Sequence, residues 1–211
     1  MKTIPSIISV LALSTGLYAE EPHSAKIVNI EAKLQPTPDY QAKGPSSKKV
    51  EVRDWIEIEA EVLVHTSDPS GYIPELKVNW YAAVKDKVKK KTTGHEFSVK
   101  LMGDSTYKNI STKNGKVYLS AYIEPRVLER YLGDSHIRLS DFTAFAMTLS
   151  GEGLKVDEKT KQVPFMSTVK TGGAWWDNWK YDYLVESIRS KSKTPFSMMW
   201  IDRYPAEKVV Q

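Results

Sequence analysis

A two-residue alternation between residues 50 and 64 constrains this chain more than any other feature. The apolar side chains of one parity are Val50, Val52, Ile56, Ile58, Ala60, Val62 and Val64. The charged side chains of the other parity are Glu51, Arg53, Glu57, Glu59 and Glu61. Because successive side chains of a strand point to opposite faces, this pattern predicts a long strand with one apolar and one solvated face. Trp55 falls on the charged parity, so we expect a bulge or bend near Asp54.

Similar but shorter patterns recur along the chain. Further strands are expected over residues 25–34, 75–85, 97–101, 117–123, 140–150 and 163–169. Trp80 is centred on the apolar face of the third strand, as in immunoglobulin-like sandwiches, although the cysteine pair of that fold is missing. Pro125 and Gly133 delimit a short helix that would cross between two sheets. The sequence therefore predicts a mostly β, immunoglobulin-like sandwich of about seven strands with a short crossover helix.

The C-terminal region departs from this β pattern and is rich in aromatic residues. It carries four of the six tryptophans, which are Trp175, Trp176, Trp179 and Trp200. Asp177 suits a helix N-cap, and an apolar stripe at i, i+3, i+4 and i+7 follows it. That stripe consists of Tyr181, Leu184, Val185 and Ile188. We therefore expect residues 20–171 to form the sandwich and residues 172–211 to pack on it as an amphipathic helix followed by an apolar latch.

The N-terminal residues and the amino-acid composition bear on localisation. Residues 1–19 combine Lys2, an apolar stretch and Ala19, a pattern typical of a cleavable signal peptide. The chain has no cysteine, so the fold depends on a packed core and not on disulfides. We therefore expect an exported protein of the periplasm or outer cell surface, without a membrane span in the mature chain. The formal net charge of +4 is too small to indicate nucleic-acid binding.

Motifs for catalysis, metals or cofactors do not stand out in the sequence. The four histidines, His23, His65, His95 and His136, lie in separate segments without ligand spacing. No Gly-x-Ser-x-Gly elbow occurs. Glu57, Glu59 and Glu61 follow one strand face, which favours a solvated surface over the converging carboxylates of a glycosidase. We therefore expect no enzyme, no catalytic residue, no metal and no cofactor; a hydrolase with a dispersed site is the lesser alternative.

Two groups of residues are candidates for binding. Trp175, Trp176, Trp179 and Tyr183 could complete the core, or they could dock a protein partner or stack on the sugar rings of a glycan or mucin. The second group is a basic patch formed by Lys87, Lys89, Lys90 and Lys91. It could engage an acidic partner, an anionic glycan or lipid head groups, or it could be a solvated strand end that blocks edge-to-edge pairing.

The C-terminal region also carries a family resemblance. Its tryptophan-rich start, Lys193-Thr194-Pro195-Phe196 and Trp200-Ile201-Asp202-Arg203-Tyr204 resemble a family of exported bacterial immunoglobulin-like proteins encoded with type IV pilus assembly genes. The resemblance implies an accessory, non-pilin role with envelope or pilus-assembly proteins as partners. It supplies no catalytic residue. The function expected is thus a non-enzymatic binding or assembly module of the cell envelope, with a glycan-binding surface module as the alternative.

Overall fold

The computed structural model describes residues 22–38, 52–134, 136–156, 163–169 and 173–208. The expected signal peptide lies outside these residues. Within them, the strands are β1 (His23–Pro36), β2 (Asp54–Thr66), β3 (Tyr72–Lys85), β4 (Ser98–Ser111), β5 (Lys116–Ile123), β6 (Phe142–Ser150), β7 (Phe165–Ser167), β8 (Tyr183–Leu184) and β9 (Ile188–Ser190). The helices are α1 (Lys87–Thr93) and α2 (Pro125–Leu132), with short 3₁₀ turns η1 (Leu139–Asp141) and η2 (Lys191–Lys193).

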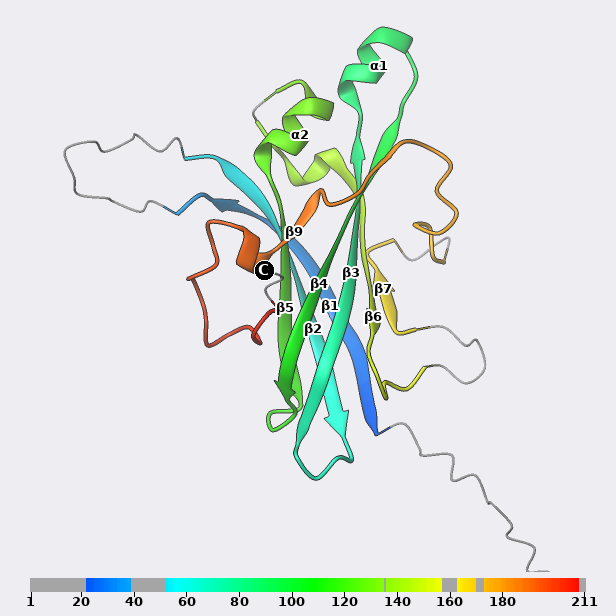
Figure 1. Cartoon of the computed structure of the whole chain (residues 1–211). Helices are drawn as coiled ribbons and strands as arrows, with labels where there is room; N and C mark the ends of the chain where they lie inside the picture. The colour runs from blue at the N-terminus through cyan, green and yellow to red at the C-terminus, as the bar shows by residue number, and fades with distance from the viewer. Residues whose placement is uncertain (1–21, 39–51, 135, 157–162, 170–172, 209–211) are drawn as a thin grey trace, which may run out of the picture.

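The strands form two sheets packed face to face, so the predicted mostly β sandwich is confirmed (Figure 1). One sheet has the order β1-β2-β5-β9, and the other has the order β7-β6-β3-β4-β8. Lettering β1 to β7 as A, B, C, C′, E, F and G gives one sheet with A-B-E and one with G-F-C-C′, an order found in immunoglobulin-like sandwiches. β8 and β9 are additions from the C-terminal region, one to each sheet.

The core lies between the sheets and is filled by the apolar parities of their strands. The alternation predicted for residues 50–64 is confirmed in β2, because Ile56, Ile58 and Val62 are fully buried. It is wrong at Val52, which is 57% exposed before β2 begins, and Val50 lies outside the described residues. Trp80 is also fully buried, and its indole N–H donates to Ser105 Oγ at 3.3 Å. Tyr107 of β4 joins the two sheets: its hydroxyl donates to the Ser120 carbonyl of β5 at 2.9 Å. Burial raises the pKa of Tyr107 well above its ordinary value, so this link stays protonated.

Both helices lie at the same end of the sandwich (Figure 1). The predicted crossover helix is confirmed as α2, which begins at Pro125, ends at the left-handed Gly133 and connects β5 of one sheet to β6 of the other. The basic patch lies on α1, which follows β3, and it does not form the solvated strand end that the sequence also suggested. Asp86 caps it by accepting from the Lys89 backbone N–H at 2.8 Å, and Gly94 ends it with φ 75°. The local cap and terminator therefore decide the conformation of this run.

The expected C-terminal amphipathic helix is wrong. Residues 173–208 form turns, β8, β9 and η2, with no α-helix among them. Leu184 and Ile188 of the expected stripe face the sandwich, whereas Tyr181 and Val185 are exposed. Helical spacing was not decisive because unpaired strand edges compete for this segment's backbone, and because its Trp, Tyr, Asp and Asn residues are modest helix formers.

Candidate functional site

Residues 173–208, here called the C-terminal segment, close the open side of the sandwich between β4 and β5. β8 runs parallel to β4 at Lys100 and Leu101, and β9 runs antiparallel to Ala121–Ile123 of β5. Further along, the Lys108 N–H donates to the Ala206 carbonyl at 2.9 Å, and the Lys208 N–H donates to the Thr106 carbonyl at 2.7 Å. The segment thus satisfies backbone groups that would otherwise form two free edges.

The crossing from β8 to β9 depends on Ser187 and Gly103. The Ser187 N–H donates to the Met102 carbonyl at 2.9 Å, and the Met102 N–H donates to Ser187 Oγ at 3.0 Å. At Gly103, an added Cβ would lie 1.8 Å from the Ile188 carbonyl oxygen. A glycine is therefore required here because the C-terminal segment passes directly over the β4 backbone.

The C-terminal segment also covers part of the outer face of the β1-β2-β5 sheet. Phe196 is fully buried there, with its ring stacked on Tyr122 at 4.7 Å and meeting Trp55 edge-on at 5.8 Å. Trp55 therefore lies on the charged parity because a second small core covers that face. The expected bulge near Asp54 is wrong: β2 pairs regularly with β1 there, and the irregular register lies at Ile27 and Asn29.

Glu57 lies beneath this second core and is completely buried. Its carboxylate accepts from the Tyr122 hydroxyl at 2.8 Å and the Tyr204 hydroxyl at 3.1 Å, and Lys33 Nζ lies 3.0 Å from Oε2. Burial and the nearby Glu57 charge raise the pKa of Tyr122, which remains a donor. The expectation that Glu57 belongs to a solvated face is wrong, because the C-terminal segment shields it from water.

The neighbouring Glu59 ties residue 203 to the same sheet. Arg203 Nε and Nη2 donate to its two carboxylate oxygens at 2.9 and 2.6 Å, and the Tyr204 hydroxyl donates to it as well. Burial by itself raises the pKa of Glu59, but the hydrogen bonds from Arg203 and Tyr204 outweigh it and lower that pKa from 4.5. A bidentate arginine pair fixes geometry as well as charge. The carboxylates of this face are therefore used to hold the C-terminal segment.

The three tryptophans proposed for binding lie together but do not form a flat open surface. Trp176 is only 3% exposed and stacks on Tyr81 at 5.3 Å. Trp175 meets Trp176 edge-on at 5.7 Å and Trp179 at 5.6 Å, and its indole N–H donates to Ser167 Oγ at 3.0 Å. Trp175 and Trp179 are half-buried. This edge-to-face arrangement is typical of packing between aromatic side chains.

Exposed apolar side chains follow these tryptophans. Tyr181, Tyr183 and Val185 are 63%, 64% and 58% exposed, and we call these three the aromatic face. Tyr183 is the one residue of the proposed binding set that is widely exposed, with Lys100 Nζ 5.7 Å from its ring centre. Tyr181 and Val185 were missed by sequence reasoning because both were assigned to the buried stripe of a helix.

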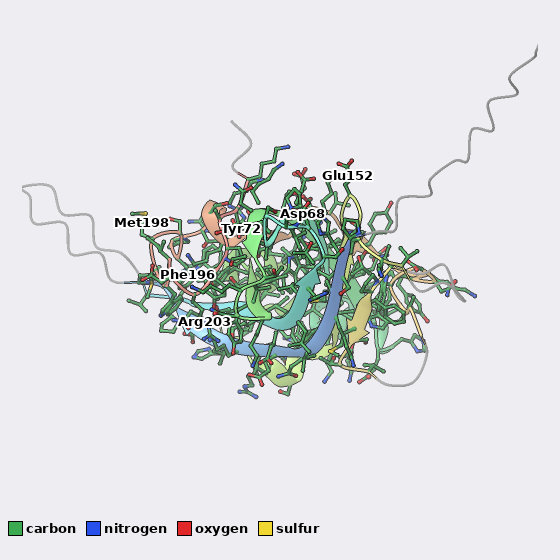
Figure 2. All side chains as sticks on the ribbon, turned by 90° about the horizontal axis from the view of Figure 1, so that it is seen from below. Asp68, Tyr72, Glu152, Phe196, Met198 and Arg203 are labelled. Carbon is green, nitrogen blue, oxygen red and sulfur yellow. The ribbon has the colours of Figure 1, made fainter. Side chains whose placement is uncertain are left out.

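A second group of exposed apolar side chains lies on the turn that carries Phe196. Phe196 lies in the second core, while Met198 lies at the outer tip of the turn (Figure 2). Trp200 and Ile201 are exposed beside it, and Trp200 has φ 51°. Left-handed backbone is uncommon for a bulky residue and indicates that the anchored ends impose the turn.

The lysines of the proposed basic patch are brought together by α1, and three of them form ion pairs. Lys87 pairs with Asp141 at 2.6 Å, Lys89 pairs with Asp182 at 3.0 Å, and Lys90 pairs with Glu96. Lys91 is exposed. Because Asp182 belongs to the C-terminal segment, the Lys89 pair makes the basic patch adjacent to the aromatic face.

No group of three or more potential ligands in the described part of the chain is arranged to hold a metal ion. Across the same residues, no helix has the length and apolar character needed to cross a membrane.

The chain is similar to known proteins at two levels. A protein-family model matches residues 17–211. A crystal structure of a protein from Akkermansia muciniphila has a TM-score of 0.73 and 20% sequence identity, covering 90% of this chain and 95% of that one. At that identity the likeness shows a shared fold. No curated protein sequence matches the chain.

Gly103→Ala tests the closure between β4 and the C-terminal segment. Because the added methyl group would meet the Ile188 carbonyl, β9 must shift, and we expect the free energy of unfolding to fall by about 1–3 kcal/mol in urea denaturation. Ser111→Thr adds a methyl group at the exposed end of the same strand and serves as the control. Equal stability of both variants would contradict the proposed close approach.

The pH dependence of stability tests the Arg203–Glu59 pair. Since the folded-state pKa of Glu59 is lowered, its contribution is fully present above 4.5 and is lost as the pH falls through the lower folded value. Arg203→Gln should therefore reduce stability at neutral pH, and the difference from wild type should shrink in acid. Thermal denaturation between about pH 7 and pH 3 would measure this. Arg126→Gln removes an exposed arginine elsewhere, and a pH-dependent difference of the same size there would refute the assignment.

Proposed function

The chain belongs to the family whose model matches residues 17–211, a family of pilus-associated extracellular proteins, and on this basis we propose that it is a non-enzymatic accessory protein of a type IV pilus-like system. It would act by protein–protein contact in the periplasm or on the outer surface. An exported chain with residues 1–19 as signal peptide fits this role. The sandwich of residues 20–171 would then present the C-terminal segment to a partner.

The observation that carries this proposal is the aromatic face. Large apolar side chains that remain exposed at neighbouring positions are typical of interaction sites, whereas isolated ones are ordinary. Tyr181 and Tyr183 supply broad rings with polar ends, a frequent composition of interface anchors. Their backbone is held close to β4 on both sides, because the Lys100 N–H donates to the Asp182 carbonyl at 3.1 Å and Ser187 binds Met102. A preformed surface loses less conformational entropy on binding.

Glycan stacking by the three tryptophans is less favoured. A sugar ring needs an open aromatic face, but Trp176 is covered by Tyr81 and the other two rings pack edge-on. Their indole N–H groups are also used internally, by Ser167 and by the Asp182 carbonyl. These contacts favour a structural role for the tryptophans, in which they support the aromatic face.

Site-specific photo-crosslinking tests the proposed role. With p-benzoylphenylalanine in place of Tyr183, we expect illumination of producing cells to link the protein to pilus-assembly components, identified by mass spectrometry. The matched control replaces Tyr72, which is 48% exposed at the start of β3, outside the C-terminal segment. The proposal fails if both positions give the same products, or if Tyr183 links only to general chaperones.

A further inference from the structure

An open depression of about 630 Å³ lies beside α1 and carries most of the lysines of that region. Its walls come from the end of β3, from α1 with the turn after it, and from residues 140–143. Lys85, Lys87, Lys90 and Lys91 line it, and we call it the lysine pocket. We propose that the lysine pocket binds the carboxylates of an acidic segment of a partner protein, which deepens the proposed function and rests on it.

The acidic groups of the pocket do not cancel its accessible charge. Asp86 is buried and caps α1. Asp141 is buried as well and pairs with Lys87 at 2.6 Å, so this lysine is neutralised within the fold. Lys85 Nζ donates to the neutral carbonyl of Ser140 at 2.7 Å. For Lys91 no ion pair occurs among the described residues. Lys85 and Lys91 therefore face the depression without an ion pair among the described residues, and the charge of Lys85 also acts on the nearby carboxylate of Glu96.

Glu96 shows how an incoming carboxylate would bind. Its side chain pairs with Lys90 at the rim, and both side chains are largely exposed, at 77% and 52%. An exposed ion pair of this kind contributes little to stability, so it exchanges easily with an external carboxylate. Glu96 therefore occupies one carboxylate position from within the chain, while Lys85 and Lys91 provide positions for others.

The surroundings favour a peptide over a small anion. A depression of this volume holds several side chains, and Phe97 adds an aromatic wall. Lys89 lies 4.5 Å from the centre of the Phe97 ring and pairs with Asp182, so the pocket borders the aromatic face. A segment that carries both acidic and aromatic side chains could occupy both surfaces at once. Phosphate or sulfate groups would use the charges alone.

Binding of a defined peptide tests this inference. The probe is a fluorescein-labelled peptide of alternating Glu and Tyr, titrated with the full chain at low ionic strength and followed by fluorescence anisotropy. Removing both free charges in Lys85→Gln/Lys91→Gln should weaken binding about tenfold, because close opposite charges steer and hold such ligands. Lys26→Gln/Lys113→Gln removes two exposed lysines elsewhere and should change the affinity by less than about twofold.

Glu96→Gln gives a result that a purely structural role would not produce. Loss of the internal competitor frees Lys90, so the peptide should bind about two- to fivefold more tightly. Melting temperatures of all variants check that folding is intact. Unchanged binding in the Lys85/Lys91 variant, or tighter binding of a sulfated oligosaccharide through the same lysines, would overturn the inference. Such a result would refute the lysine pocket. If photo-crosslinking at position 183 still links the protein to pilus-assembly components, the proposed function stands without it.

Discussion

The backbone groups along the β4 and β5 edges are the constraint on which the rest of this structure depends. A sandwich of two open sheets leaves edges whose N–H and C=O groups must be paired or protected. Here one segment serves both edges, by adding β8 to one sheet and β9 to the other. The crossing requires a serine that bonds to both backbone groups of Met102 and a glycine that leaves room for the Ile188 carbonyl.

The same closure determines which side chains remain available for binding. Phe196, Trp176 and Ile188 of the C-terminal segment are buried against the sandwich, and the carboxylates of Glu57 and Glu59 hold residues 203 and 204. What remains outside is the aromatic face, together with the lysine pocket next to it. The position of the aromatic face on a firmly paired segment makes it a defined surface. In a family of pilus-associated extracellular proteins, such a surface fits assembly by protein contact.

Sequence patterns predict those parts of the fold that are set by local chemistry. The structure confirms the alternation after Asp54, the inward-facing Trp80, and the start and end of α2 at a proline and a glycine. These features could be predicted because the burial pattern of a strand and the residues that begin or end a helix act over short distances in the sequence. The C-terminal segment was misassigned because its conformation depends on strand edges far earlier in the chain, as in the contact between Met102 and Ser187, which are 85 residues apart. One signal was present: Trp55 on the charged parity indicated that something apolar covers that face. No local pattern could show that Phe196 does so.

Hydrogen exchange of individual amides tests most directly whether the C-terminal segment is an integral part of the sandwich. The informative amides are those of Met102, Lys108 and Ser187. The first two donate hydrogen bonds from β4 to the C-terminal segment, and the Ser187 amide donates from that segment to β4. If the closure is integral, they exchange with the same opening free energy as the amides between β3 and β6, through global unfolding. Exchange of these three amides through a local opening of much lower free energy, while the β3–β6 amides remain protected, would contradict it.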